Sequence, residues 1–272
     1  MTLKRHSTWG DLFALAGLFL GATLIAALPM ATISVVAPDM ERGAMMLATY
    51  TIQFTVAIAG GVMWLRARGG ARLRFGVRWS GAPAILAGIV LTAAASIALE
   101  PVLNLFPASY LERLGEAIGR GGWAIATTVV AAPLLEEIFF RGIVLEHLSR
   151  RWSPAAAGVA SSALFALAHV PILPQMVNAF VVAVVMGYIY LSARSLLPVI
   201  VIHAANNGVA YLLLELTGTQ STDTRTMLGS DTIYWVVYGA SLVVVLLSLA
   251  AMSRRVRTKN GKNTLQSKTA DE

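Results

Sequence analysis

Two adjacent glutamates, Glu136 and Glu137, lie in an apolar stretch of this chain, and Arg141 follows four residues after the second. Residues four apart share one face of a helix, whereas adjacent residues point about 100° apart. We therefore expect Glu137 to pair with Arg141, which leaves Glu136 without a cation on its own helix. An ionised side chain at bilayer depth costs about 2.5–3.5 kcal/mol and usually marks a functional site. The pattern favours Glu136 as a general base and Glu137 with Arg141 as a structural ion pair.

Two further polar pairs lie in apolar sequence. His169 follows Phe165 by four residues, and Asn207 follows His203 by the same interval. A single intramembrane histidine most often makes a hydrogen bond between helices. Together with Glu136 on a third helix, however, the two imidazoles and the amide could supply a base, proton carriers and donors to an oxyanion.

The composition requires a membrane around these residues. The chain is 57% hydrophobic and 13% charged, with a mean hydropathy of +0.69. A membrane-spanning helix needs about 20 apolar residues. The sequence predicts an all-α, polytopic membrane bundle, a single unit over residues 1–252. Its eight predicted spans are 11–36, 44–65, 82–103, 121–146, 155–170, 175–192, 196–214 and 232–252.

The distribution of basic residues predicts the orientation. If the segments alternate across the bilayer, one side receives 16 of the 21 Lys and Arg residues and the other side four. The positive-inside rule then places both termini in the cytoplasm, and the basic residues beside the membrane attract anionic lipid. We expect no nucleic-acid partner, because no basic surface interleaved with aromatic residues is present. Residues 253–272 are predicted to be a disordered, basic cytoplasmic tail. The basic residues assigned to the cytoplasm are Lys4, Arg5, Arg66, Arg68, Arg72, Arg74, Arg78, Arg150, Arg151, Arg194 and six between Arg254 and Lys268.

The lengths of the helices predict the depth of the site. His203 lies about 10 Å from the cytoplasmic end of its span, whereas His169 lies about 22 Å from Ala155. The two histidines share a depth if the fourth helix continues to Ser149 and the fifth begins in the cytoplasm near Pro154. The connections between the fifth, sixth and seventh helices are short enough to make them antiparallel neighbours.

The chain contains three short motifs on three apolar spans: Glu136 and Glu137 with Arg141, Phe165 with His169, and His203 with Asn207. In this order they resemble the motifs of the CAAX-protease and bacteriocin-processing family (CPBP or Abi family) of intramembrane endopeptidases. The resemblance covers about residues 119–211, which would be the catalytic core. It implies that Glu136 and His169 activate water, and that His203 and Asn207 stabilise the oxyanion. Glu137 and Arg141 would maintain the shape of the site.

The resemblance also implies a substrate class and a location. Eukaryotic members of the family cleave prenylated proteins after the modified cysteine, so we expect a peptide or protein substrate, lipidated or not, with the peptide bond near its C-terminal region. The chain would be a multi-pass protein of a bacterial cytoplasmic membrane. No metal or other cofactor is expected.

Three other interpretations remain open. Two histidines and a glutamate could form a catalytic zinc site, although no HExxH sequence is present and an amide such as Asn207 is a poor zinc ligand. Buried Glu and His residues could relay protons in a transporter, although such proteins favour repeated, broken helices. The chain could also be a non-catalytic bacteriocin-immunity or scaffold protein, although it retains every motif residue.

Overall fold

The computed structural model describes residues 8–36, 39–68, 76–107, 109–217 and 224–270 of the chain, and within them it contains helices and no strand. The first three long helices are α1 (Thr8–Val36), α2 (Arg42–Ala67) and α3 (Ala82–Leu103). A short helix, α4 (Ser109–Ile118), precedes the segment that carries the two glutamates. The expected all-α bundle is confirmed.

Residues 122–148 form one helical run with two wider, π-helical stretches. Its parts are α5 (Gly122–Ile125), η1 (Ala126–Ala131), α6 (Ala132–Glu136), η2 (Glu137–Leu145) and α7 (Glu146–Leu148). The helices that follow are α8 (Pro154–Leu167), α9 (Leu173–Ala193), α10 (Leu196–Thr217), α11 (Thr224–Leu228) and α12 (Asp231–Ala270). Both glutamates therefore lie where an α-helical turn meets a π-helical stretch, a feature that is frequent at functional sites.

The predicted number of eight spans is approximately right. Among the described residues, α1, α2, α3, α9, α10 and α12 are long and apolar enough to cross a membrane. The other two predicted spans coincide with residues 122–148 and with α8, which is apolar but has only 14 residues. A full crossing needs about 20 residues, so α8 is too short to span the bilayer without its flanking residues.

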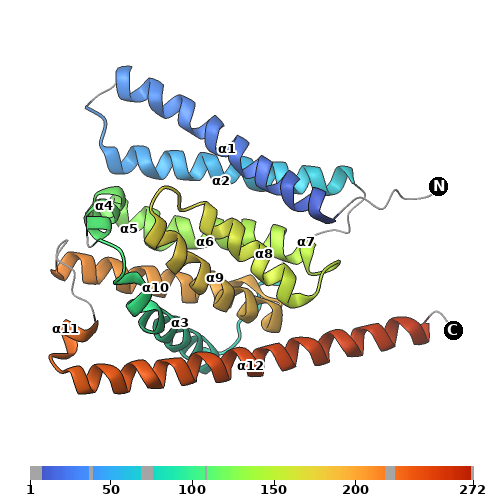
Figure 1. Ribbon diagram of the computed structural model, residues 1–272. Helices are drawn as coiled ribbons and strands as arrows, with labels where there is room; N and C mark the ends of the chain where they lie inside the picture. Colours follow the sequence, from blue (N-terminus) through green and yellow to red (C-terminus); the bar gives the residue numbers. More distant parts are fainter. Residues whose placement is uncertain (1–7, 37–38, 69–75, 108, 218–223, 271–272) are drawn as a thin grey trace.

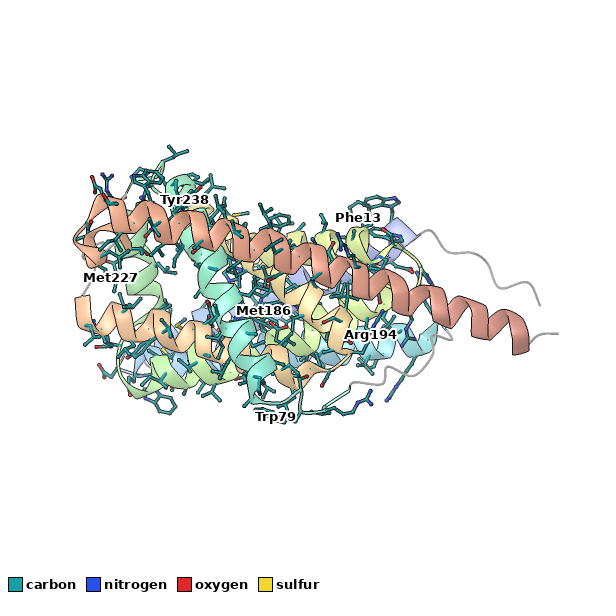
Figure 2. All side chains as sticks on the ribbon, turned by 90° about the horizontal axis from the view of Figure 1, so that it is seen from below. Phe13, Trp79, Met186, Arg194, Met227 and Tyr238 are labelled. Atoms are coloured by element: carbon teal, nitrogen blue, oxygen red, sulfur yellow. The ribbon has the colours of Figure 1, made fainter. Side chains whose placement is uncertain are left out.

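The long helices form a layered bundle in which the site lies centrally (Figure 1). α1 and α2 pack as a pair on one side, α12 lies along the other side against α3, and the segments from α5 to α10 lie between them. Figure 2 shows α12 running across α3 on the outside of the bundle, with Met227 and Arg194 toward opposite ends. The expected neighbours α8 and α9 pack against each other, as do α9 and α10.

The start of α1 and the end of α12 lie at the same end of the bundle (Figure 1), as an even number of passes requires. A buried acid joins the helices at this end. Asp11 is 1% exposed and accepts hydrogen bonds from Arg151 and, at 2.8 Å, from Arg68, and His147 Nε2 lies 3.0 Å from its other oxygen. Glu146 makes a similar junction, with Arg194 Nη1 at 2.9 Å. The basic residues at this end are therefore partly neutralised within the protein.

The C-terminal tail differs from the sequence prediction. Disorder was expected from residue 253 onward, but α12 continues as a helix to Ala270. The segment has no proline and is rich in good helix formers. Extending an existing helix avoids the cost of nucleation, so the basic segment can continue the apolar one. Residues 271–272 lie outside the described part of the chain, as do four of the basic residues used to predict the orientation: Lys4, Arg5, Arg72 and Arg74.

Candidate active site

Glu137 and Arg141 form the ion pair that their spacing predicts. Arg141 Nη1 donates to Glu137 Oε1 at 3.0 Å, and the two side chains are 2% and 0% exposed, respectively. The second Arg141 nitrogen, Nη2, donates to the carbonyl of Ala183 on α9 at 3.3 Å, and the guanidinium lies 4.8 Å from the centroid of the Phe165 ring. The arginine thus connects the glutamate helix to α8 and α9 in the buried interior.

His203 lies between the two glutamates. Its Nδ1 is 2.8 Å from Glu137 Oε1, and its Nε2 is 3.7 Å from Glu136 Oε2. A carboxylate accepts hydrogen bonds, so Glu137 fixes the Nδ1–H form of the ring and turns the other nitrogen toward Glu136. Glu137 therefore contacts both Arg141 and His203. The sequence analysis expected only the structural ion pair with Arg141.

Glu136 also has a partner that the sequence analysis did not identify. The hydroxyl of Tyr50, on α2, donates a hydrogen bond to Glu136 Oε1. Tyr50 lies 86 residues earlier in the chain, and a tyrosine in an apolar span carries no signal of this contact. The prediction that Glu136 lacks a cation on its own helix is correct, but its carboxylate is held from two other helices, α2 and α10.

Asn207 lies one turn beyond His203 and is held by the helix opposite. Its Nδ2 donates to the carbonyl of Thr128 at 2.9 Å, within the π-helical stretch η1. The side-chain amide has two N–H groups, so one remains for another acceptor. In the second π-helical stretch, the carbonyl of Phe140 accepts a hydrogen bond from Ser161 Oγ of α8 at 2.9 Å. Side chains of neighbouring helices thus donate hydrogen bonds to backbone carbonyls in both π-helical stretches. Backbone carbonyls in a bilayer interior need such partners, because water is absent there.

His169 lies just beyond the end of α8 and is half-buried, as Asn207 is, whereas Glu136 and His203 are buried. Its Nδ1 is 3.0 Å from the carbonyl of Phe165, and the two rings are 4.9 Å apart. The same Phe165 ring lies 6.1 Å from the ring of His203. The two histidines therefore contact the same aromatic ring, and α8 begins at Pro154, where the sequence analysis expected the fifth helix to begin. Among the described residues, His169 makes no hydrogen bond to Glu136.

Close helix packing keeps His203 in place. A side chain on Gly88 of α3 would come within 2.3 Å of Ile202 Cδ1, so the glycine allows α3 to approach α10 next to the histidine. Phe139 and Phe140, on the glutamate helix, are completely buried. Within the described parts of the chain, no group of three His, Asp or Glu residues is arranged to hold a metal ion.

A membrane-embedded helical bundle with a buried carboxylate–imidazole site defines a class of intramembrane proteins that includes intramembrane hydrolases. Residues 120–209 match the model of the family described as type II CAAX prenyl endopeptidase, Rce1-like. This match supports the family resemblance drawn from the three motifs, and it covers nearly the same segment of the chain. The chain is an integral membrane protein. No similar curated protein and no similar solved structure was found.

Proposed function

We propose that this chain is an intramembrane endopeptidase that hydrolyses a peptide bond near the C-terminal region of a membrane-associated or lipidated protein or peptide. The observation that carries the proposal is the position of His203, which contacts Glu137 through one ring nitrogen and faces Glu136 through the other. A buried carboxylate beside an oriented imidazole is an arrangement suited to general-base activation of water.

In the proposed reaction, Glu136 is the general base. A water molecule within hydrogen-bonding reach of Glu136 Oε2 transfers a proton to it while its oxygen attacks the carbonyl carbon of the scissile peptide bond. The carbonyl π electrons move to oxygen and give a tetrahedral oxyanion. Collapse of this intermediate breaks the C–N bond, and the proton held by Glu136 passes to the leaving amine. The proton balance closes without a cofactor.

His203 and Asn207 would stabilise the oxyanion. Because Nδ1–H of His203 is engaged by Glu137, the ring can donate to the oxyanion only through a protonated Nε2, that is, as an imidazolium. An imidazolium and Arg141 together balance the charges of the two carboxylates in the buried site. The free N–H of the Asn207 amide supplies the second donor. One such donor typically contributes a factor of about 10²–10³ to turnover.

His169 would act from the side on which the substrate arrives. It is half-buried, lies where α8 ends, and shares the Phe165 ring with His203. In this position it can orient the attacking water together with Glu136, in the role that the family resemblance implies. It is the proposed catalytic residue whose contribution depends most on bound substrate.

The proposed substrate class follows from the family and the surroundings of the site. The family that residues 120–209 match is that of type II CAAX prenyl endopeptidases. The site lies among helices whose outer surfaces carry many exposed large apolar residues, so a substrate that is itself in the membrane can reach it without entering water. A prenyl or other lipid chain would hold such a peptide at the bilayer.

The experiment uses the full chain, purified and reconstituted into lipid vesicles. A peptide that ends in a farnesylated CAAX sequence, the same peptide with unmodified cysteine, and a peptide library are incubated with the protein, and products are identified by mass spectrometry. We expect cleavage by the wild type and none by Glu136→Gln. Activity should survive exhaustive chelation, because the proposed mechanism uses no metal.

Other outcomes would favour the alternative functions. Stoichiometric zinc, with activity lost on its removal and restored by its return, would favour a zinc protease. Proton-coupled uptake into vesicles without cleavage of any peptide would favour a transporter. Protection of cells against a bacteriocin that persists in Glu136→Gln would favour an immunity or scaffold protein.

A further inference from the structure

Tyr50 is the only residue from the first three helices that contacts a proposed catalytic side chain among the described hydrogen bonds, and it lies outside the residues that match the family. We propose that Tyr50 is a positioning residue for Glu136. Its hydroxyl holds Oε1, so that Oε2 faces His203 and is the oxygen that accepts the proton from water. This inference rests on the proposed endopeptidase function. It extends the active site to the α1–α2 pair, which positions Glu136 through Tyr50.

The Tyr50 ring is fixed by a cluster of buried aromatic side chains. It lies 4.8 Å from Phe54, with an angle of 30° between the ring planes. Phe54 is 2% exposed and packs against Phe139 and Phe140, which flank the glutamates along the chain. Phe19 of α1 contacts the same three phenylalanines. The hydroxyl is therefore placed by a packed core that joins α1, α2 and the glutamate helix.

The hydrogen bond constrains a carboxylate that would otherwise turn. The terminal torsion of a glutamate is broad and roughly two-fold, so an unheld carboxylate samples many orientations. With Oε1 bound by Tyr50, the position of Oε2 is set at 3.7 Å from His203 Nε2. The hydroxyl keeps its own proton throughout, so the proposed reaction has the same proton balance as before.

The test is Tyr50→Phe in the full chain, reconstituted and assayed with a peptide that the wild type cleaves. The phenylalanine keeps the ring contacts and removes only the hydroxyl. We expect kcat to fall about tenfold or more, as loss of a hydrogen bond to a charged group implies. KM should stay within about twofold, because the substrate contacts are unchanged. The unfolding temperature should change little, because the ring packing is kept.

Tyr190→Phe is the matched control. Tyr190 is also buried and also donates to a glutamate, Glu146 Oε2 at 3.0 Å, but it lies in the ion-pair junction at the end of the bundle. Loss of its hydroxyl should leave kcat within about twofold of the wild type. A second variant carries 3-fluorotyrosine at position 50, which keeps both the ring and the hydroxyl donor. It should keep kcat close to the wild-type value.

The outcomes separate the two proposals. A wild type that cleaves the peptide, with a Tyr50→Phe protein that has the same kcat, would overturn the role of Tyr50 and leave the endopeptidase function standing. A fall in kcat that only follows a lower unfolding temperature, or that Tyr190→Phe shows equally, would also overturn it. A wild type that cleaves no peptide would overturn both proposals.

Discussion

His203 and Glu137 form a buried hydrogen bond, 2.8 Å from Nδ1 to Oε1, that turns the opposite edge of the imidazole toward Glu136. In this arrangement one carboxylate orients the ring and a second carboxylate stands at its other nitrogen. The two adjacent glutamates of the sequence therefore contact the same histidine from different sides, and their substitutions should have different effects.

Glu137→Gln should affect both stability and activity. The change leaves Arg141 without its charged partner in the interior, and breaking such a pair costs about 3–5 kcal/mol. It also replaces the charged acceptor that orients His203 with a neutral amide, which can turn its NH₂ group toward the ring, so turnover should fall at least about tenfold even in the folded fraction. Thermal unfolding and the activity of the monodisperse protein measure the two effects separately.

The double variant Glu137→Gln with Arg141→Met separates the two roles of Glu137. Removing the stranded guanidinium should recover part of the unfolding temperature, because the coupling belongs to the pair. Turnover should not recover, because His203 still faces a neutral amide in place of the carboxylate. Full recovery of turnover would show that Glu137 acts only through Arg141.

Asn207→Ala should lower kcat by about 10²–10³-fold, the usual contribution of one oxyanion donor. The amide also donates to the carbonyl of Thr128, so a modest loss of stability should accompany the change. Asn104→Ala is the control, because Asn104 is exposed at the C-terminal end of α3. Equal kcat values for the two variants would argue against an oxyanion role for Asn207.

Both termini should lie in the cytoplasm, with residues 215–231 on the opposite side. The start of α1 and the end of α12 already lie at one end of the bundle (Figure 1), and this end carries most of the basic residues. Reporter fusions at each terminus and within residues 218–223 measure the orientation. An external C-terminus would contradict both the predicted orientation and the even number of passes.

The parts of the site that depend on nearby residues could be predicted from the sequence. The pairing of Glu137 with Arg141 follows from a spacing of four on one helix, and the eight apolar stretches follow from their lengths. The start of the fifth helix near Pro154 followed from the rise per residue and the positions of the two histidines.

The long-range contacts could not be predicted in the same way. Tyr50 reaches Glu136 across 86 positions, and Asn207 reaches Thr128 across 79. These contacts depend on how α2 and α10 pack against the glutamate helix, which no local pattern specifies. The sequence analysis expected disorder from residue 253 on the basis of charge and polarity, without weighing the helix that precedes this segment, whereas α12 extends to Ala270.

Glu136→Gln is the most direct measurement of the proposed function. The substitution keeps the size of the side chain and an acceptor for Tyr50, but removes the group that takes the proton from water. Hydrolysis of the same peptide by reconstituted wild type and Glu136→Gln should differ by at least about 10²-fold, with the unfolding temperature nearly unchanged or slightly higher. Substantial hydrolysis by a well-folded Glu136→Gln protein would show that Glu136 is not the base.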